Sequence, residues 1–244
     1  MDVNPWYLDW KLWSAVVAWL SFTMNVAPWI NKKLKGTKLS VSPYHSFSLS
    51  HRIGSANIQW HMRFDNDGGD ELGIEKVQII VRDKTGELKL NAASFFQSKS
   101  TDAIVMAGFR LKPGESWQAY LWFCEDLPRD TNRQFRDMES ATRKELSESA
   151  LHNPMAKNVI TASLYDKTLA FFNKNFKLQP SEYQIEIQVL TTQAKTYTFS
   201  GYRFVLYESD IAELRSHTQR YITGDGISWY SETNTWMFVP TTKN

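Results

Sequence analysis

The feature that most constrains this chain is an uncharged apolar run near its beginning. From Leu12 to Ile30 there is no charged residue, and Lys32 and Lys33 follow almost at once. As a helix, the run spans about 28 Å, close to the ~30 Å hydrocarbon thickness of a bilayer. Tryptophans lie near both of its ends, where an indole ring favours the membrane interface. The run therefore predicts a single membrane-spanning helix.

The charges on either side of the run predict the orientation of that helix. Four lysines without acidic neighbours follow it: Lys32, Lys33, Lys35 and Lys38. Asp2, Asp9 and a single lysine precede it, so the positive-inside rule places residues 37–244 in the cytoplasm. A cleaved signal peptide would carry its basic residues before the run. We expect the four lysines to lie against anionic lipid at about 1 kcal/mol each, which makes the bilayer one expected partner.

Small and weakly polar residues form a stripe along one face of the predicted helix. At about 100° per residue, this stripe contains Ser14, Ala18, Ser21 and Asn25. Small residues let membrane helices approach closely, and an amide gains from a hydrogen bond across the interface. We therefore expect the helix to bind another protein or a second copy of itself. Two alternatives stay open: an amphipathic helix lying on the membrane, or a tryptophan-rich core helix.

The remainder of the chain alternates as half-buried strands do. Ile58, Trp60, Met62 and Phe64 are separated by polar residues, and similar segments recur between turns that contain glycine. The segment LKPGESWQAYLWF resembles a turn and strand found in many immunoglobulin-like sandwiches. Short strands at regular spacing indicate a β-sandwich or a barrel, and of these we predict an antiparallel β-sandwich, immunoglobulin-like in the broad sense, over residues 37–244. It follows a membrane anchor at residues 1–36.

Two segments break the strand pattern and predict helices. Residues 129–150 are polar and carry a thin apolar stripe at helical spacing, which indicates an inserted helix. The stripe consists of Phe135, Met138, Thr142 and Leu146. A second, short helix is expected near the C-terminus, capped by Ser209 or Asp210 and ended by Gly224. Its apolar face carries Ile211, Leu214, Thr218 and Tyr221.

Composition excludes some functions and leaves others without a motif. The formal net charge is only +2, and basic residues near position 136 alternate with acidic ones, so no nucleic-acid partner is expected. The sequence contains no P-loop, HExxH, GxSxG or CxxC motif. Cys124 is the single cysteine and lies in a strand-like run, which favours a buried, inert thiol.

Two groups of residues have the chemistry of metal ligands but not a specific pattern. His45, His51 and His61 lie close in sequence, and three imidazoles can hold zinc, although solvated histidines are the default interpretation. The segment DNDGGDE at residues 65–71 offers oxygens for calcium. Its spacing departs from the EF-hand pattern, because Gly69 replaces a ligand and Lys76 stands at the glutamate position. A hairpin turn explains the same residues, so no metal or cofactor is predicted.

These observations lead to a functional hypothesis. We expect a single-pass, membrane-anchored cytoplasmic binding or adaptor module, or an accessory subunit of a membrane-associated complex, without catalytic residues. The alternative is an enzyme, a hydrolase or a metal-dependent activity, whose site is assembled from residues distant in sequence.

Overall fold

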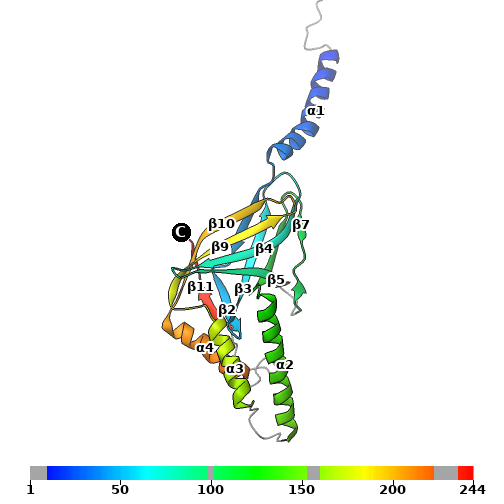
Figure 1. The fold of residues 1–244 in the computed structure, drawn as a ribbon. Coiled ribbons are helices and arrows are strands. Elements are labelled where there is room, and N and C mark those ends of the chain that lie inside the picture. The colour runs from blue at the N-terminus through cyan, green and yellow to red at the C-terminus, as the bar shows by residue number, and fades with distance from the viewer. Residues whose placement is uncertain (1–9, 98–101, 153–159, 223–235, 244) are drawn as a thin grey trace, which may run out of the picture.

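The computed structural model describes residues 10–97, 102–152, 160–222 and 236–243. It shows a strongly curved antiparallel sheet with a helix, α1, leaving one end and three helices, α2, α3 and α4, at the other (Figure 1). The helices are α1 (Trp10–Leu34), α2 (Arg129–His152), α3 (Ala162–Asn175) and α4 (Glu208–Ile222). The first seven strands are β1 (Leu39–Pro43), β2 (Ser46–Arg52), β3 (Ser55–Asn66), β4 (Leu72–Arg82), β5 (Glu87–Phe96), β6 (Ile104–Val105) and β7 (Phe109–Leu111). The remaining five are β8 (Ser116–Glu125), β9 (Ser181–Thr191), β10 (Thr196–Leu206), β11 (Met237–Pro240) and β12 (Thr242–Lys243).

The sheet forms a nearly closed barrel, and the prediction of an immunoglobulin-like sandwich is wrong. The strands follow one path, β11-β2-β3-β8-β5-β4-β9-β10-β12, instead of dividing into two packed sheets. The β4–β5 and β9–β10 hairpins agree with the sequence, since in each of them two consecutive alternating segments are joined by a short turn. By contrast, β8 pairs with β3 and β5, while β7 pairs with β4. The alternation of apolar and polar residues identifies each strand but does not specify which strands pair.

The barrel interior explains why these residues form strands. Trp60, Met62 and Phe64 of β3 are fully buried, whereas His61 and Arg63 between them are not. β8 and β9 alternate in the same way, whereas β4 has consecutive buried residues at 72–74 and 79–81. Large side chains fill the interior, which is the usual solution in small barrels. Burial of these apolar surfaces is therefore the main stabilising term.

A short segment near the C-terminus completes the barrel by pairing with both of its edges. Met237–Pro240 lies antiparallel to β2, and Thr242 and Lys243 then pair with Arg203 and Tyr202 of β10. Between the two strands, the Thr241 N–H donates to the His45 carbonyl at 2.7 Å. The alternation in SWYSETNTWMFV also predicts a final hairpin over residues 228–239, of which residues 228–235 lie outside the described chain.

The helices at the far end confirm two predictions and add one element. Phe135 and Leu146 from the predicted apolar stripe of α2 are buried, and so are Ile211 and Leu214 of α4. α3 is an element that the sequence pattern does not predict, and Thr161 caps it by accepting a hydrogen bond from the Leu164 N–H. The three helices pack on one another, and a small apolar cluster joins them. It consists of Leu146, Ile160, Leu164 and Ile222.

The prediction of a membrane-spanning helix is wrong. In the described part of the chain, no helix combines the length and the apolar character that crossing a bilayer requires. In α1 the cause is composition, because serine, threonine, asparagine and proline interrupt the run and tryptophan is only weakly hydrophobic. The single-pass location and the cytoplasmic orientation inferred from it are therefore not supported.

The closure of the barrel leads to a prediction about the free energy of unfolding. Phe204 of β10 is buried, with its ring centroid 5.0 Å from that of Phe47 on β2. We expect Phe204→Ala to lower the free energy of unfolding by about 3–5 kcal/mol, because it leaves a cavity where the two edges meet. Phe238→Ala, at a residue of β11 that is 71% exposed, is the control and should change it by less than about 0.5 kcal/mol. Urea denaturation measures both, and equal effects would contradict this account of closure.

Candidate functional site

Helix α1 exposes apolar side chains along its length. Trp19 is 70% exposed and Met24 75% exposed, although neither carries a charge that would favour water. The exposed large apolar residues of α1 are Trp10, Trp13, Val16, Val17, Trp19, Leu20, Phe22, Met24 and Ile30. At the helical period they cover about two thirds of the circumference, and the remaining sector holds the small and polar stripe of Ser14, Ala18, Ser21 and Asn25. So broad an exposed apolar surface has the character of an interaction surface.

The structure places the predicted packing residues on this helix. Ser14, Ala18 and Ser21 lie on α1 with exposed side chains, and Asn25 belongs to the same helix, with its side chain outside the description. The role predicted for them in helix packing stays a prediction. Among the predicted surface lysines, Lys35 and Lys38 are exposed, whereas the side chains of Lys32 and Lys33 are not described. A lipid-facing role for all four also stays a sequence prediction.

The helix is joined to the barrel by backbone hydrogen bonds. The Gly36 carbonyl accepts from the N–H groups of Gly69 at 2.7 Å and Asp70 at 3.4 Å. The Lys38 carbonyl accepts from the Asp67 N–H at 2.9 Å, and the Tyr197 hydroxyl donates to the Thr37 carbonyl at 3.1 Å. These bonds tie the link between α1 and β1 to the connection between β3 and β4 and to β10.

The β3–β4 connection is organised by the side chain of Asn66. This residue is 1% exposed, and its amide nitrogen donates to the carbonyls of Asp70 at 2.8 Å and Leu111 at 2.9 Å. Its amide oxygen accepts from the Gly68 N–H at 3.0 Å. The predicted hairpin is therefore wrong, because β3 and β4 are not paired with each other and the segment carries the α1 junction. Two adjacent glycines among Asn and Asp were the sequence signal for this tight contact.

The carboxylates of this segment do not share one centre. Asp67 accepts from the Ser40 hydroxyl at 2.8 Å, while Asp65 accepts from Arg63 at 2.8 Å and from Ser116. Within the ranges that the structure describes, no three His, Cys, Asp or Glu side chains are grouped as a metal site requires.

The three histidines considered as zinc ligands lie in different surroundings. His45 stacks near Tyr44 with ring centroids 3.9 Å apart, and His61 lies 4.7 Å from the ring of Tyr120 on the outer surface. His51 instead lies between the barrel and the helices. The strand expected to carry His45 and His51 is interrupted, because the register on β3 shifts by two residues between β1 and β2.

His51 connects the barrel to the helices. Its Nε2 lies 2.6 Å from the Leu214 carbonyl of α4, and its Nδ1 accepts from the Gly54 N–H at 3.3 Å. Its ring also contacts Phe172 and Phe176, with centroids 5.2 and 5.5 Å away. Burial lowers the pKa of His51 to about 4, the bond to Leu214 opposes this shift, and His217 adds to it. The neutral Nε2–H tautomer fits both hydrogen bonds.

Two further groups with shifted pKa values also lie in structural contacts. Burial raises the pKa of the Cys124 thiol to about 11, which keeps it protonated at neutral pH, although the residue is half-buried and not buried as the sequence predicts. Burial, reinforced by Glu139, raises the pKa of Tyr221 to about 12. Glu139 itself pairs with Arg52 at 2.6 Å, and the guanidinium of Arg52 lies 4.7 Å above the Phe135 ring. These contacts hold α2 against β2.

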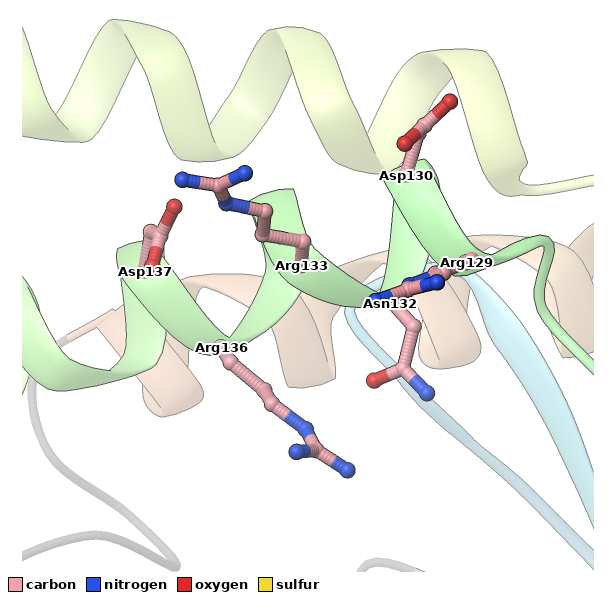
Figure 2. Close-up of a pocket in the computed structure, with 6 residues that line it drawn as sticks. All are labelled: Arg129, Asp130, Asn132, Arg133, Arg136 and Asp137. Atoms are coloured by element: carbon pink, nitrogen blue, oxygen red, sulfur yellow. The ribbon is translucent and has the colours of Figure 1, made fainter.

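A surface hollow lies along the start of α2 (Figure 2). Its volume is about 670 Å³, and its lining residues are Arg129, Asp130, Asn132, Arg133, Arg136 and Asp137. Figure 2 shows Arg136 pointing away from α3, while Arg133 extends in the direction of that helix. All six belong to one helix, five of them are exposed, and the charges alternate in sign. This surface is the solvated helix face expected from the sequence and does not enclose a ligand.

Comparisons with known proteins add little to this description. No protein-family model matches the sequence, and no curated protein matches it. A similar solved structure is the crystal structure of a Bordetella pertussis protein described as ApaA, at 9% sequence identity and a TM-score of 0.27. The match covers 71% of this chain and 95% of that one. A likeness this weak supports no statement about fold or function.

The α1 junction leads to a prediction about Gly68. A Cβ at this residue would lie 2.5 Å from the Gly36 oxygen and 2.6 Å from the Lys38 nitrogen, and both are backbone atoms. We expect Gly68→Ala to lower the free energy of unfolding by about 1–3 kcal/mol and to speed amide exchange at Gly69. Gly86→Ala is the matched control, since a Cβ there meets nothing within 4 Å. Chemical denaturation and hydrogen exchange test this; an unchanged Gly69 amide would contradict it.

The environment of His51 predicts how stability depends on pH. The unfolded chain binds a proton at His51 near pH 6.5, whereas the folded chain does so only near pH 4. Stability should therefore fall as the pH decreases from 6.5 to 4, by up to roughly 3 kcal/mol from this residue. Replacing His51 with Gln should flatten the dependence, because Gln can still donate to Leu214 but does not titrate.

The control for this measurement is His45→Gln, which replaces an exposed histidine. Urea denaturation across the pH range gives the slope for each protein. An identical slope in His51→Gln and the wild type would show that another group causes the dependence.

Proposed function

We propose that this chain is a non-catalytic assembly module in which α1 binds the α1 helix of a second copy. The observation that supports this proposal is the exposure of apolar side chains over most of the circumference of α1. Leaving this surface in water is unfavourable by about 25 cal/mol for each Å², so association through it is strongly driven. The helix is about 37 Å long, enough for an extensive pairing.

The distribution of charge favours an antiparallel pair. Acidic residues, Asp2 and Asp9, precede α1 in the sequence, while Lys32, Lys33 and Lys35 are at its other end. An antiparallel arrangement brings acidic and basic ends together and opposes the two helix dipoles. A parallel arrangement would instead place lysines beside lysines. Because α1 points away from the barrel, the two barrels of an antiparallel pair would lie at opposite ends (Figure 1).

The predicted packing stripe fits the same arrangement. In an antiparallel pair centred between residues 19 and 20, Ser14 faces Asn25 of the partner, and Ala18 faces Ser21. Small residues then lie at the centre, where the helix axes approach most closely, and polar residues lie opposite each other. The pair would act as an adaptor that holds two barrels at a fixed separation.

The alternative hypothesis, an enzyme, has less support. His51, Cys124 and Tyr221, whose pKa values are strongly shifted, are in contacts that hold the helices and strands together. Functional sites usually combine shifted pKa values with an open cavity. None of these three residues lines the hollow on α2.

The association of the full chain tests this proposal. Light scattering after size exclusion should show a dimer for the wild type. Ala18→Glu and Ser21→Glu each place a charge at the centre of the proposed interface and should weaken the dimer by roughly 100-fold or more. Val105→Glu is the control, since Val105 on β6 is 76% exposed but far from α1 in sequence. A monomeric wild type would overturn the proposal.

Disulfide cross-linking tests the direction of the pair. Mixed Ser14→Cys and Asn25→Cys chains should form a disulfide with each other, because the two positions face each other only in the antiparallel arrangement. Each variant alone should cross-link poorly. Efficient cross-linking of each variant with itself would show a parallel pair and overturn the antiparallel arrangement.

A further inference from the structure

The turn between β2 and β3 packs closely against the end of α3. A Cβ added to Gly54, in this turn, would lie 2.8 Å from the carbonyl oxygen of Phe172 and 3.0 Å from the backbone nitrogen of Phe176. Ile53 beside it is buried and has a φ of 45°, a conformation that β-branched residues rarely adopt. Such a conformation persists only where the surrounding structure imposes it, so the turn depends on its packing against the helices.

His51, near the end of β2, connects this turn to α4. In its neutral Nε2–H form it donates to the Leu214 carbonyl, and its Nδ1 accepts from the Gly54 N–H. The buried ring of His217 is stacked on that of His51, with centroids 6.2 Å apart. Two imidazoles are therefore enclosed together where α4 meets β2.

The charged groups around His51 are cations or are already paired. On α4, the guanidinium of Arg215 lies 5.1 Å from the ring of Phe176, which also contacts His51. Glu139 of α2 pairs with Arg52, and no carboxylate is among the described groups that shift the pKa of His51. The neighbours from α3 and β3 are uncharged, namely Phe172 and Ala56.

We propose that His51, stacked on His217, is an acid-sensitive latch whose protonation separates α3 and α4 from the β2–β3 turn while the barrel stays folded. A protonated imidazole carries N–H groups on both nitrogens, so Nδ1 of His51 can no longer accept from the Gly54 N–H. Arg215, and His217 when it is also protonated, repel the new charge in a site shielded from water. Protonation of buried histidines rearranges interfaces in this way.

The positions of the two helices in the chain let them move together. Residues 176–180 link α3 to β9, and Tyr207 links β10 to α4. Ser181 of β9 pairs with Leu206 of β10, so both helices are attached at one end of a single hairpin. Their release from the turn breaks no strand pairing, and it is therefore a local opening, distinct from unfolding of the whole chain.

Hydrogen exchange of the full chain at pH 7 and pH 5 tests this inference, which does not depend on the α1 pairing. The open form should bind a proton at His51 near pH 6.5 and the closed form near pH 4, so the open population should rise about 20-fold between pH 7 and pH 5. Protection factors of the α3 and α4 amides should fall by at least that factor. At both pH values they should be smaller than those of the Trp60 and Met62 amides in β3.

Two matched variants identify the group that responds to acid. His51→Gln should remove most of the change, because Gln can donate to Leu214 but does not titrate, whereas the control His45→Gln should keep it. Protection of the helix amides that does not change in the wild type would overturn the proposal. So would equal losses in His51→Gln and the wild type. A common protection factor for the helix and β3 amides would also overturn it, since the helices would then leave only when the whole chain unfolds.

Discussion

The segment of residues 237–243 pairs with both edges of one curved sheet, and the rest of the barrel depends on this double pairing. Phe204 and Phe47 come from the two edges and meet in the core, so the interior is shielded from water only when the edges are held together. A single short segment does this with four pairs to β2 and two to β10. At Thr241 the segment passes from β2 to β10, and the surface groove lined by Phe204, Phe238 and Val239 lies beside this point. Closure and the open groove are therefore two results of the same chain path.

The strands were predictable from the sequence because alternation along one strand is a local property. Ile58, Trp60, Met62 and Phe64 reveal their buried face without reference to any other segment. The α2 stripe from Phe135 to Leu146 was predictable for the same reason. Strand order was not, because β8 lies between β3 and β5, and no pattern within β8 specifies those neighbours. Regularly spaced short strands fit a barrel as well as a sandwich, and the local likeness at residues 111–123 carries no information about closure.

Some features of the candidate surfaces were also evident from the sequence, whereas others were not. The unusual character of α1 was evident from its tryptophans and the absence of charge between Leu12 and Ile30, but its composition did not support a bilayer span. The roles of Asn66 and His51 were not evident. Each acts through contacts with residues distant in sequence, Leu111 for Asn66 and Leu214 for His51. The groove between β10 and β11 also depends on tertiary structure, because Val205 and Phe238, which both line it, lie on strands far apart in the sequence.

The way α1 is attached has a mechanical consequence. β1 follows α1 directly and is antiparallel to β3 over five consecutive pairs, from Leu39–Asn66 to Pro43–Met62. A force applied along α1, away from the barrel, would load these pairs in shear, so that the hydrogen bonds stretch together and not one after another. The bonds of Gly36 and Lys38 to the β3–β4 connection share the same load. A pull on α1 would therefore be resisted together by β1 and β3, by the β3–β4 connection and, through the bond of Tyr197 to Thr37, by β10.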